Sequence, residues 1–123
     1  MAEDYRAVKA AADAAVARGS IPELANRWAL PADLMNCGLA YLVEREAGRP
    51  CRQYPDLIRK VWGDGAIIAN PDGSAFGYHA LAYDWIYDAL TPEERQRYGR
   101  ALGTWLRFYT DQPEILLKYG YWE

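Results

Sequence analysis

Residues 80–95 of this chain are Ala80-Leu81-Ala82-Tyr83-Asp84-Trp85-Ile86-Tyr87-Asp88-Ala89-Leu90-Thr91-Pro92-Glu93-Glu94-Arg95. Thr91 is typical of a helix N-cap, Pro92 then occupies the first helical position, and Glu94 completes a capping box. The stretch predicts an aromatic-rich helix over about 74–90, a tight stop, and a second helix over about 92–109. These two helices form a predicted hairpin, and the rest of the chain repeats the same kind of signal.

Four further helices are predicted upstream from helical spacing and from glycine and proline signals, over about 3–18, 20–28, 31–47 and 55–62. The second of these rests on Ser20-Ile21-Pro22-Glu23, interpreted as a cap followed by proline and glutamate. Residues 63–73 are predicted to be an internal loop that includes the turn Asn70-Pro71-Asp72-Gly73. Short links between six helices predict an all-α fold in which successive helices pack as antiparallel hairpins.

Length and charge limit the classes of partner. The 123 residues are expected to form a single helical domain over 1–123. A net charge of -3 argues against nucleic acid, and no apolar run reaches the roughly 18 residues that a membrane span needs. The acidic start, Met1-Ala2-Glu3-Asp4, does not resemble a signal peptide. Neither nucleic acid nor a membrane is therefore expected as a partner.

Metal and cofactor chemistry finds little support in the sequence. Cys37 and Cys51 are too few for a disulfide framework and are expected to be free thiols. His79 is the single histidine of the chain, so no zinc site is predicted. Neither a P-loop nor a nucleophile elbow occurs. No metal and no cofactor are predicted.

The aromatic residues are biased toward rings with a polar group. The chain has five tryptophans and ten tyrosines but two phenylalanines. Such rings suit half-buried surfaces, where one edge packs and the other meets water, a partner or a sugar. A tyrosine-rich core is the alternative interpretation.

Two stretches resemble the α/α toroid of the heparinase II/III-like polysaccharide lyases and their alginate-lyase relatives. The first is the hairpin at 80–95. The second is Cys37-Gly38-Leu39-Ala40-Tyr41-Leu42-Val43, followed by Gly48, Tyr54, Leu57-Ile58 and Trp62. Together they cover roughly residues 30 to 110, and the hairpin at 80–95 is the more specific of the two.

The resemblance implies an incomplete (α/α) toroid that corresponds to the N-terminal part of such a lyase. It implies a role in β-elimination of an acidic, uronate-containing polysaccharide, in the periplasm or outside the cell. Those enzymes carry an Asn-rich, His-containing catalytic loop that this sequence lacks, so the chain is expected to be a fragment or a truncated relative. The segment would supply scaffold and a sugar-binding groove, with its catalytic residues unassigned.

Four side chains are the predicted substrate-binding residues: Tyr78, His79, Tyr83 and Trp85. His79 and Tyr83 are four residues apart, which places them on one helix face. His79 is either a substrate contact or a packed histidine bonded to a neighbouring helix, and Trp85 either stacks on sugar or belongs to the core. Further candidates are Trp28 for stacking, Asp84 and Asp88 as a carboxylate pair, and Asn36 and Arg27 for a uronate carboxylate.

Two alternative functions remain open from the sequence. The first is a stand-alone helical interaction module without enzymatic activity. It would use the edge at 109–122, which includes most of the apolar, aromatic tail at 112–123, for a protein partner or for self-association. The second is a toroid-type glycosidase, which would need paired carboxylates facing a groove.

Overall fold

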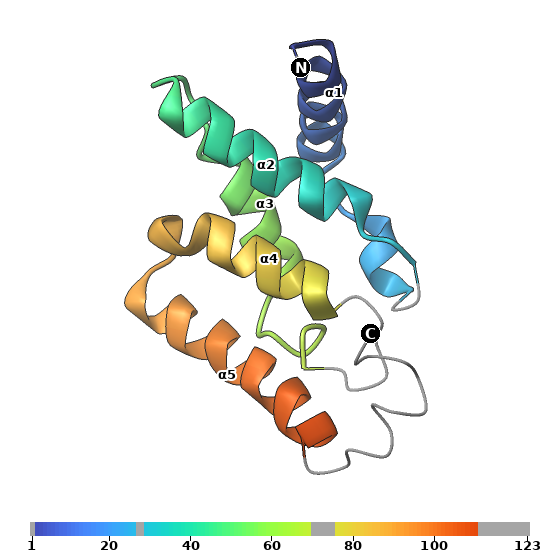
Figure 1. Cartoon of the computed structure of the whole chain (residues 1–123), viewed down its shortest axis with the longest axis vertical. Helices are drawn as coiled ribbons and strands as arrows, with labels where there is room; N and C mark the ends of the chain where they lie inside the picture. The colour runs from blue at the N-terminus through green and yellow to red at the C-terminus, as the bar shows by residue number, and fades with distance from the viewer. Residues whose placement is uncertain (1, 27–28, 70–75, 111–123) are drawn as a thin grey trace.

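The computed structural model in Figure 1 describes residues 2–26, 29–69 and 76–110. Its α-helices are α1 (Ala2–Arg18), α2 (Ala32–Glu46), α3 (Gln53–Trp62), α4 (Phe76–Ile86) and α5 (Pro92–Thr110). Two short 3-10 helices, η1 (Pro22–Ala25) and η2 (Tyr87–Ala89), join them. The described residues contain no strand, so the predicted all-α class is confirmed.

The predicted capping box at the start of α5 is confirmed. The Glu94 backbone N–H donates to Thr91 Oγ1 over 3.1 Å, and the Thr91 N–H donates to Glu94 Oε1 over 2.9 Å. Two backbone donors at this helix end are thereby satisfied reciprocally. The predicted glycine stops also hold, because Gly19 and Gly63 adopt positive φ angles of 75° and 55° after α1 and α3.

Three predicted boundaries are wrong. The helix expected over 20–28 is the single 3-10 turn η1, and its N-cap position is Ile21, with no side-chain cap. Ser20 Oγ instead accepts a hydrogen bond from Arg18 Nε over 3.2 Å. Helix α3 begins at Gln53, whereas the expected start was at about residue 55. Helix α4 ends at Ile86, short of the expected end at about residue 90, and the chain continues as the 3-10 helix η2.

Helix α2 is the centre of the arrangement. It contacts α1, α3 and α4, and α4 in turn contacts α5. Figure 1 shows α2 and α4 side by side and running in the same direction, while α5 folds back along α4 as the predicted hairpin. The α2–α4 pairing joins helices that are not neighbours along the chain, so the antiparallel-hairpin expectation describes only part of the packing.

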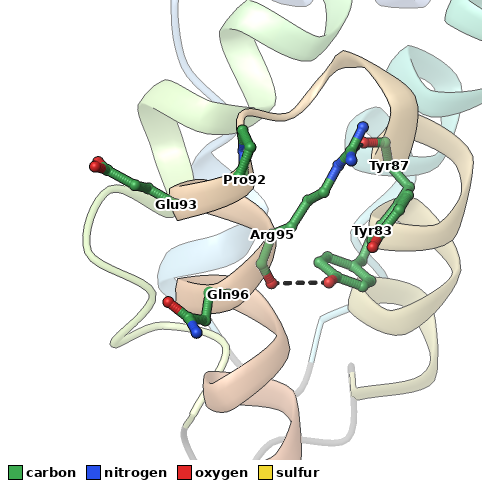
Figure 2. Close-up of a pocket in the computed structure, with 6 residues that line it drawn as sticks. All are labelled: Tyr83, Tyr87, Pro92, Glu93, Arg95 and Gln96. Carbon is green, nitrogen blue, oxygen red and sulfur yellow. Dashed lines mark hydrogen bonds between the residues drawn. The ribbon is translucent and has the colours of Figure 1, made fainter.

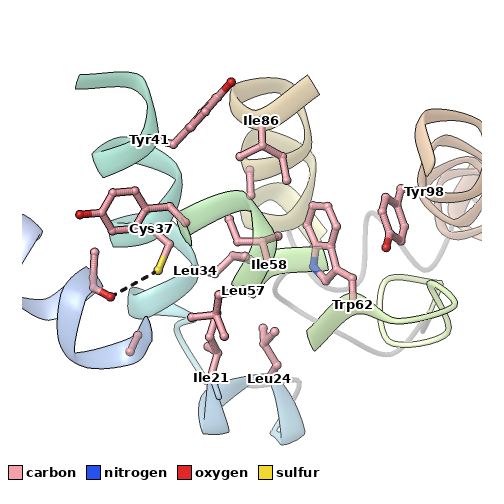
Figure 3. Packing of buried hydrophobic residues seen from close by; sticks show 14 of the residues in the cluster. Ile21, Leu24, Leu34, Cys37, Tyr41, Leu57, Ile58, Trp62, Ile86 and Tyr98 are labelled. Carbon is pink, nitrogen blue, oxygen red and sulfur yellow. Dashed lines mark hydrogen bonds between the residues drawn. The ribbon is translucent and has the colours of Figure 1, made fainter. Parts of the chain in front are cut away.

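The core between these helices is rich in tyrosine and tryptophan (Figure 3). Tyr41, Tyr54, Trp62 and Tyr98 are all at most 5% exposed, and Figure 3 labels Tyr41, Trp62 and Tyr98. Each buried phenol finds an acceptor: the Tyr98 hydroxyl donates to the Gly63 carbonyl oxygen over 3.1 Å, for example. The tyrosine-rich core is therefore real, and it uses rings whose polar end is satisfied.

Two tyrosine–carboxylate bonds attach α1 to the rest of the molecule. The Tyr5 hydroxyl donates to Glu44 Oε1 over 2.9 Å, and the buried Glu44 carboxylate also pairs with Arg49. The Tyr54 hydroxyl donates to Asp13 Oδ1 over 2.6 Å. The bond from Arg49 holds the pKa of Glu44 below its usual value. These bonds supplement the packing of α1, whose fully buried side chains are alanines.

The structure describes the two cysteines and part of the predicted loop, whereas the predicted turn and tail lie outside the described residues. Cys37 and Cys51 are free thiols, and burial raises the pKa of Cys37 to about 12. The loop at 63–73 is described to residue 69 and buries Ile68; the turn at 70–73 and the tail at 112–123 lie beyond the described ranges.

Within the described ranges, no three His, Cys, Asp or Glu side chains gather as a metal site would require. Across the same ranges, every helix is too short or too polar to span a bilayer.

Candidate functional site

An open pocket of about 500 Å³ lies where α4 turns into α5. Figure 2 shows the six side chains that line it, from the last turn of α4, from η2 and from the first turn of α5: Tyr83, Tyr87, Pro92, Glu93, Arg95 and Gln96. The capping box fixes the start of α5, so the hairpin turn itself brings the two sides of the pocket together. Five of the six lining residues belong to the hairpin at 80–95.

Two tyrosines form the aromatic side of the pocket. The rings of Tyr83 and Tyr87 are four residues apart along the chain and meet edge to face, with centroids 5.5 Å apart and planes at 77°. Tyr83 is half-buried, and its hydroxyl donates to the Arg95 carbonyl oxygen over 2.8 Å. Tyr87 is 44% exposed, so its ring is accessible to a ligand. The tyrosines thus provide one fixed ring and one accessible ring.

Arg95 supplies the positive charge of the pocket. Its Nε donates to the Tyr87 carbonyl oxygen over 2.9 Å, and its guanidinium carbon lies 4.4 Å from the centre of the Tyr87 ring. This is cation–π geometry, and it restricts a side chain that is otherwise flexible. Arg95 is therefore held against the aromatic side of the pocket.

The turn between α4 and α5 is anchored to α3. Arg59 Nη1 donates to the Ala89 carbonyl oxygen over 2.6 Å and lies 3.5 Å from Glu94 Oε1. Its Nη2 pairs with Asp56. One largely buried arginine of α3 thus bonds both sides of the turn.

The turn is also anchored to α2. The Tyr41 hydroxyl donates to Asp88 Oδ1 over 2.9 Å, and Arg45 pairs with the second oxygen of the same carboxylate. Hydrogen bonds from α2 and α3 both hold η2 in place. The pocket is therefore preorganised, and its side chains and turn would lose little conformational entropy when a ligand binds.

The chemistry of the pocket favours binding over catalysis. Burial raises the pKa of Tyr83, and its hydroxyl proton is already donated to a backbone carbonyl, so this phenol is not prepared to act as a base. Glu93 is the single carboxylate among the lining side chains, and it is exposed. Paired carboxylates of the kind that a glycosidase needs do not line this pocket.

Of the four predicted substrate-binding residues, the structure places only Tyr83 in the pocket. Tyr78 is 40% exposed near the start of α4, away from the lining set. Trp85 is half-buried and packs against the backbone of α2 at Gly38. Neither Tyr78 nor Trp85 lines the pocket beside Tyr83. Their sugar-binding roles stay predictions.

His79, a residue of α4, is buried against α3. Its side chain is 6% exposed, and its Nδ1 accepts a hydrogen bond from Trp62 Nε1 over 3.0 Å. Burial lowers the pKa of His79 to about 4, which keeps the ring neutral near pH 7. The geometry is that of a packed histidine bonded to a neighbouring helix, and a substrate role for it stays a prediction.

The remaining candidates are dispersed. Asp88 serves the anchor to α2, Asp84 is exposed, and Asn36 is half-buried on α2. Asp84 and Asp88 are therefore used differently, despite their helical spacing. Trp28 and Arg27 lie outside the described residues.

The sequence interpretation missed Tyr87, Arg95 and Gln96. One signal was available for Tyr87, since it follows Tyr83 by four residues and so lies on the same helix face. The sequence carries no comparable signal for Arg95, because only the geometry of the turn brings it beside Tyr87.

In comparisons with known proteins, no family model, no curated protein and no solved structure matches the chain.

Proposed function

We propose that this chain is a sugar-binding scaffold segment of a helical toroid that acts on acidic, uronate-containing polysaccharide. By its resemblance to heparinase II/III-like lyases, it belongs with the N-terminal part of such an enzyme. The segment supplies helices and groove wall, and the β-elimination chemistry is performed by residues outside the pocket described above. A complete active site is not part of this proposal.

The observation that carries the proposal is the coincidence of the pocket with the resembling hairpin. The hairpin at 80–95 supplies five of the six lining residues, including Tyr83, Tyr87 and Arg95. An exposed tyrosine that can contact the C–H groups of a sugar, next to a fixed cation, suits an acidic sugar unit. The parallel course of α2 and α4 also suits an α/α array, where alternate helices lie in the same layer.

Calorimetric titration of the chain with oligomannuronate tests this function. We expect saturable binding in the wild type and loss of most of it in Tyr87→Ala, because that change removes the accessible ring. Leu81→Ala is the matched control, since it removes a similarly exposed apolar side chain of α4 outside the pocket. Absence of binding by a folded wild-type chain, or equal losses in both variants, would contradict the proposal.

A parallel assay for unsaturated uronate products tests the second part of the proposal. We expect binding without product, because neither a base nor an acid is prepared in the pocket. Product release by the chain alone would show that it holds a complete active site.

A helical protein-interaction module is the second candidate function. Tyr78 and Leu81 of α4 are 40% and 41% exposed and three residues apart, so they form a small apolar surface. The edge at 109–122 that the sequence predicts for this role lies almost wholly beyond the described residues. Self-association that weakens in Leu81→Ser, together with no sugar binding, would favour this function.

A further inference from the structure

We propose that Arg95 is the carboxylate receptor of this pocket, binding the planar carboxylate of a uronate unit through its terminal guanidinium nitrogens. This inference rests on the proposed function and adds to it the residue that distinguishes an acidic sugar from a neutral one. Three features of the structure support it: the contacts that hold Arg95, the partners of the neighbouring carboxylates, and the directions in which the pocket side chains point.

The guanidinium of Arg95 is held in a way that leaves its terminal edge for a ligand. Its Nε is bonded to the Tyr87 carbonyl oxygen, and its carbon lies 4.4 Å from the Tyr87 ring centre. These two contacts fix the position of the group without using its terminal nitrogens, Nη1 and Nη2. A planar fork of two N–H donors matches the two oxygens of a carboxylate.

Two of the carboxylates close to Arg95 along the chain, those of Asp88 and Glu94, are committed to other partners. Asp88 accepts from Tyr41 and pairs with Arg45. Glu94 accepts from the Thr91 N–H and faces Arg59 across 3.5 Å. Within the ranges that the structure describes, no ion pair includes Arg95. Its charge is therefore left for an external anion.

The one acidic side chain that lines the pocket points away from this group. Figure 2 shows the Glu93 carboxylate directed outward, on the opposite side of the α5 backbone from the tyrosines, whereas the Arg95 side chain extends toward Tyr87. The aromatic side of the pocket therefore carries a cation and no lining carboxylate. A uronate placed there would lie against the exposed part of the Tyr87 side chain and direct its carboxylate to the terminal nitrogens of Arg95.

Titration of Arg95→Gln and Arg95→Lys with oligomannuronate tests the assignment. We expect Arg95→Gln to weaken binding about tenfold or more, since a charge-assisted hydrogen bond contributes at least that factor. Arg95→Lys should recover part of the affinity, because it keeps the charge but loses the two-pronged geometry. Arg100→Gln is the matched control: it removes an exposed arginine of the same helix from outside the pocket and should bind like the wild type.

Two further probes separate carboxylate recognition from general attraction to anions. Carboxyl-reduced oligomannuronate should bind the wild type and Arg95→Gln equally, and sulfated dextran oligomers should bind the wild type less tightly than oligomannuronate. Sulfated oligomers that bind as tightly as oligomannuronate, or an Arg100→Gln loss as large as that of Arg95→Gln, would overturn the assignment in favour of unspecific charge.

The outcomes also separate this inference from the proposed function. If Arg95→Gln binds oligomannuronate like the wild type while Tyr87→Ala does not, the pocket binds sugar and Arg95 is not its receptor. If the wild type binds none of the three probes, the proposed function fails and the inference fails with it. Circular dichroism and cooperative thermal unfolding of each variant show that the fold is intact.

Discussion

At Gly38 the lack of a side chain lets α2 approach Trp85 of α4 very closely. A Cβ atom at this position would lie 2.7 Å from Trp85 Cε3, closer than real Cβ contacts come. The indole is therefore packed against the α2 backbone, which explains why Trp85 does not line the pocket. Its contribution to the molecule is to hold α2 and α4 together.

The first prediction concerns this contact. Gly38→Ala should lower the free energy of unfolding by about 1–3 kcal/mol, because the added methyl must displace the Trp85 ring. Gly103→Ala, within α5, meets no atom within 4 Å of the new methyl. This change should raise the free energy of unfolding by up to about 1 kcal/mol. Urea denaturation of both variants measures the difference. Equal stability of Gly38→Ala and the wild type would show that α2 and α4 have room to separate.

At the scale of the element, the start of α5 determines the shape of the pocket. The first turn of this helix carries Pro92, Glu93 and Arg95, and its direction depends on the cap at Thr91. A cap satisfies backbone donors that would otherwise face water unpaired. Loss of the cap would therefore both weaken the helix end and loosen one side of the pocket.

The second prediction tests this dependence. Thr91→Ala should cost about 0.5–2 kcal/mol of unfolding free energy and should also weaken oligosaccharide binding, because the first turn of α5 frays. Thr104→Ala serves as the control, since that hydroxyl bonds the Arg100 carbonyl oxygen inside the same helix and caps nothing. Its stability should stay within about 0.5 kcal/mol of the wild type. A Thr91→Ala variant with unchanged stability would show that packing alone fixes the turn.

At the scale of the whole molecule, a buried aromatic cluster joins α3, α4 and α5. The Trp62 indole donates to His79, and its ring meets Tyr98 edge to face with centroids 5.0 Å apart. The cluster requires a neutral imidazole, because a protonated Nδ1 cannot accept the bond from Trp62. Protonation of His79 therefore opposes the packing of three helices at once.

The third prediction follows from the lowered pKa of His79. The pKa of this side chain is about 4 in the folded protein, against an ordinary value of 6.5, so the unfolded chain binds the proton more readily. The contribution of His79 to stability is present above about pH 6.5 and is lost as the pH falls toward 4, by roughly 3 kcal/mol.

His79→Asn isolates this contribution, because the amide oxygen can still accept from Trp62 but does not titrate. Denaturant unfolding at pH 7 and pH 4 should show that the free energy of unfolding of the wild type, relative to that of the variant, falls by roughly 3 kcal/mol between the two pH values. A constant difference across this range would mean that His79 titrates normally in the fold.

Local signals in the sequence determined the all-α class, the helix stops at Gly19 and Gly63, and the hairpin at 80–95. These features depend on backbone hydrogen bonds and φ angles within a few residues, so the side chains nearby specify them. The same locality explains the error over 20–28, where the apparent cap at Ser20 is not used. Of the four predicted binding residues, Tyr83 lines the pocket at the hairpin turn, but the sequence did not predict that pocket.

Tertiary structure alone decided the rest. The pairing of α2 with α4, the burial of His79 against Trp62, and the meeting of Arg95 with Tyr87 all join groups whose distance depends on how whole helices pack. Burial is set by that packing and not by residue type, which is why the sequence left two interpretations open for both His79 and Trp85, a sugar contact and a packed side chain. The cation beside the exposed tyrosine exists only because the turn, bonded to α2 and α3, places the first turn of α5 there.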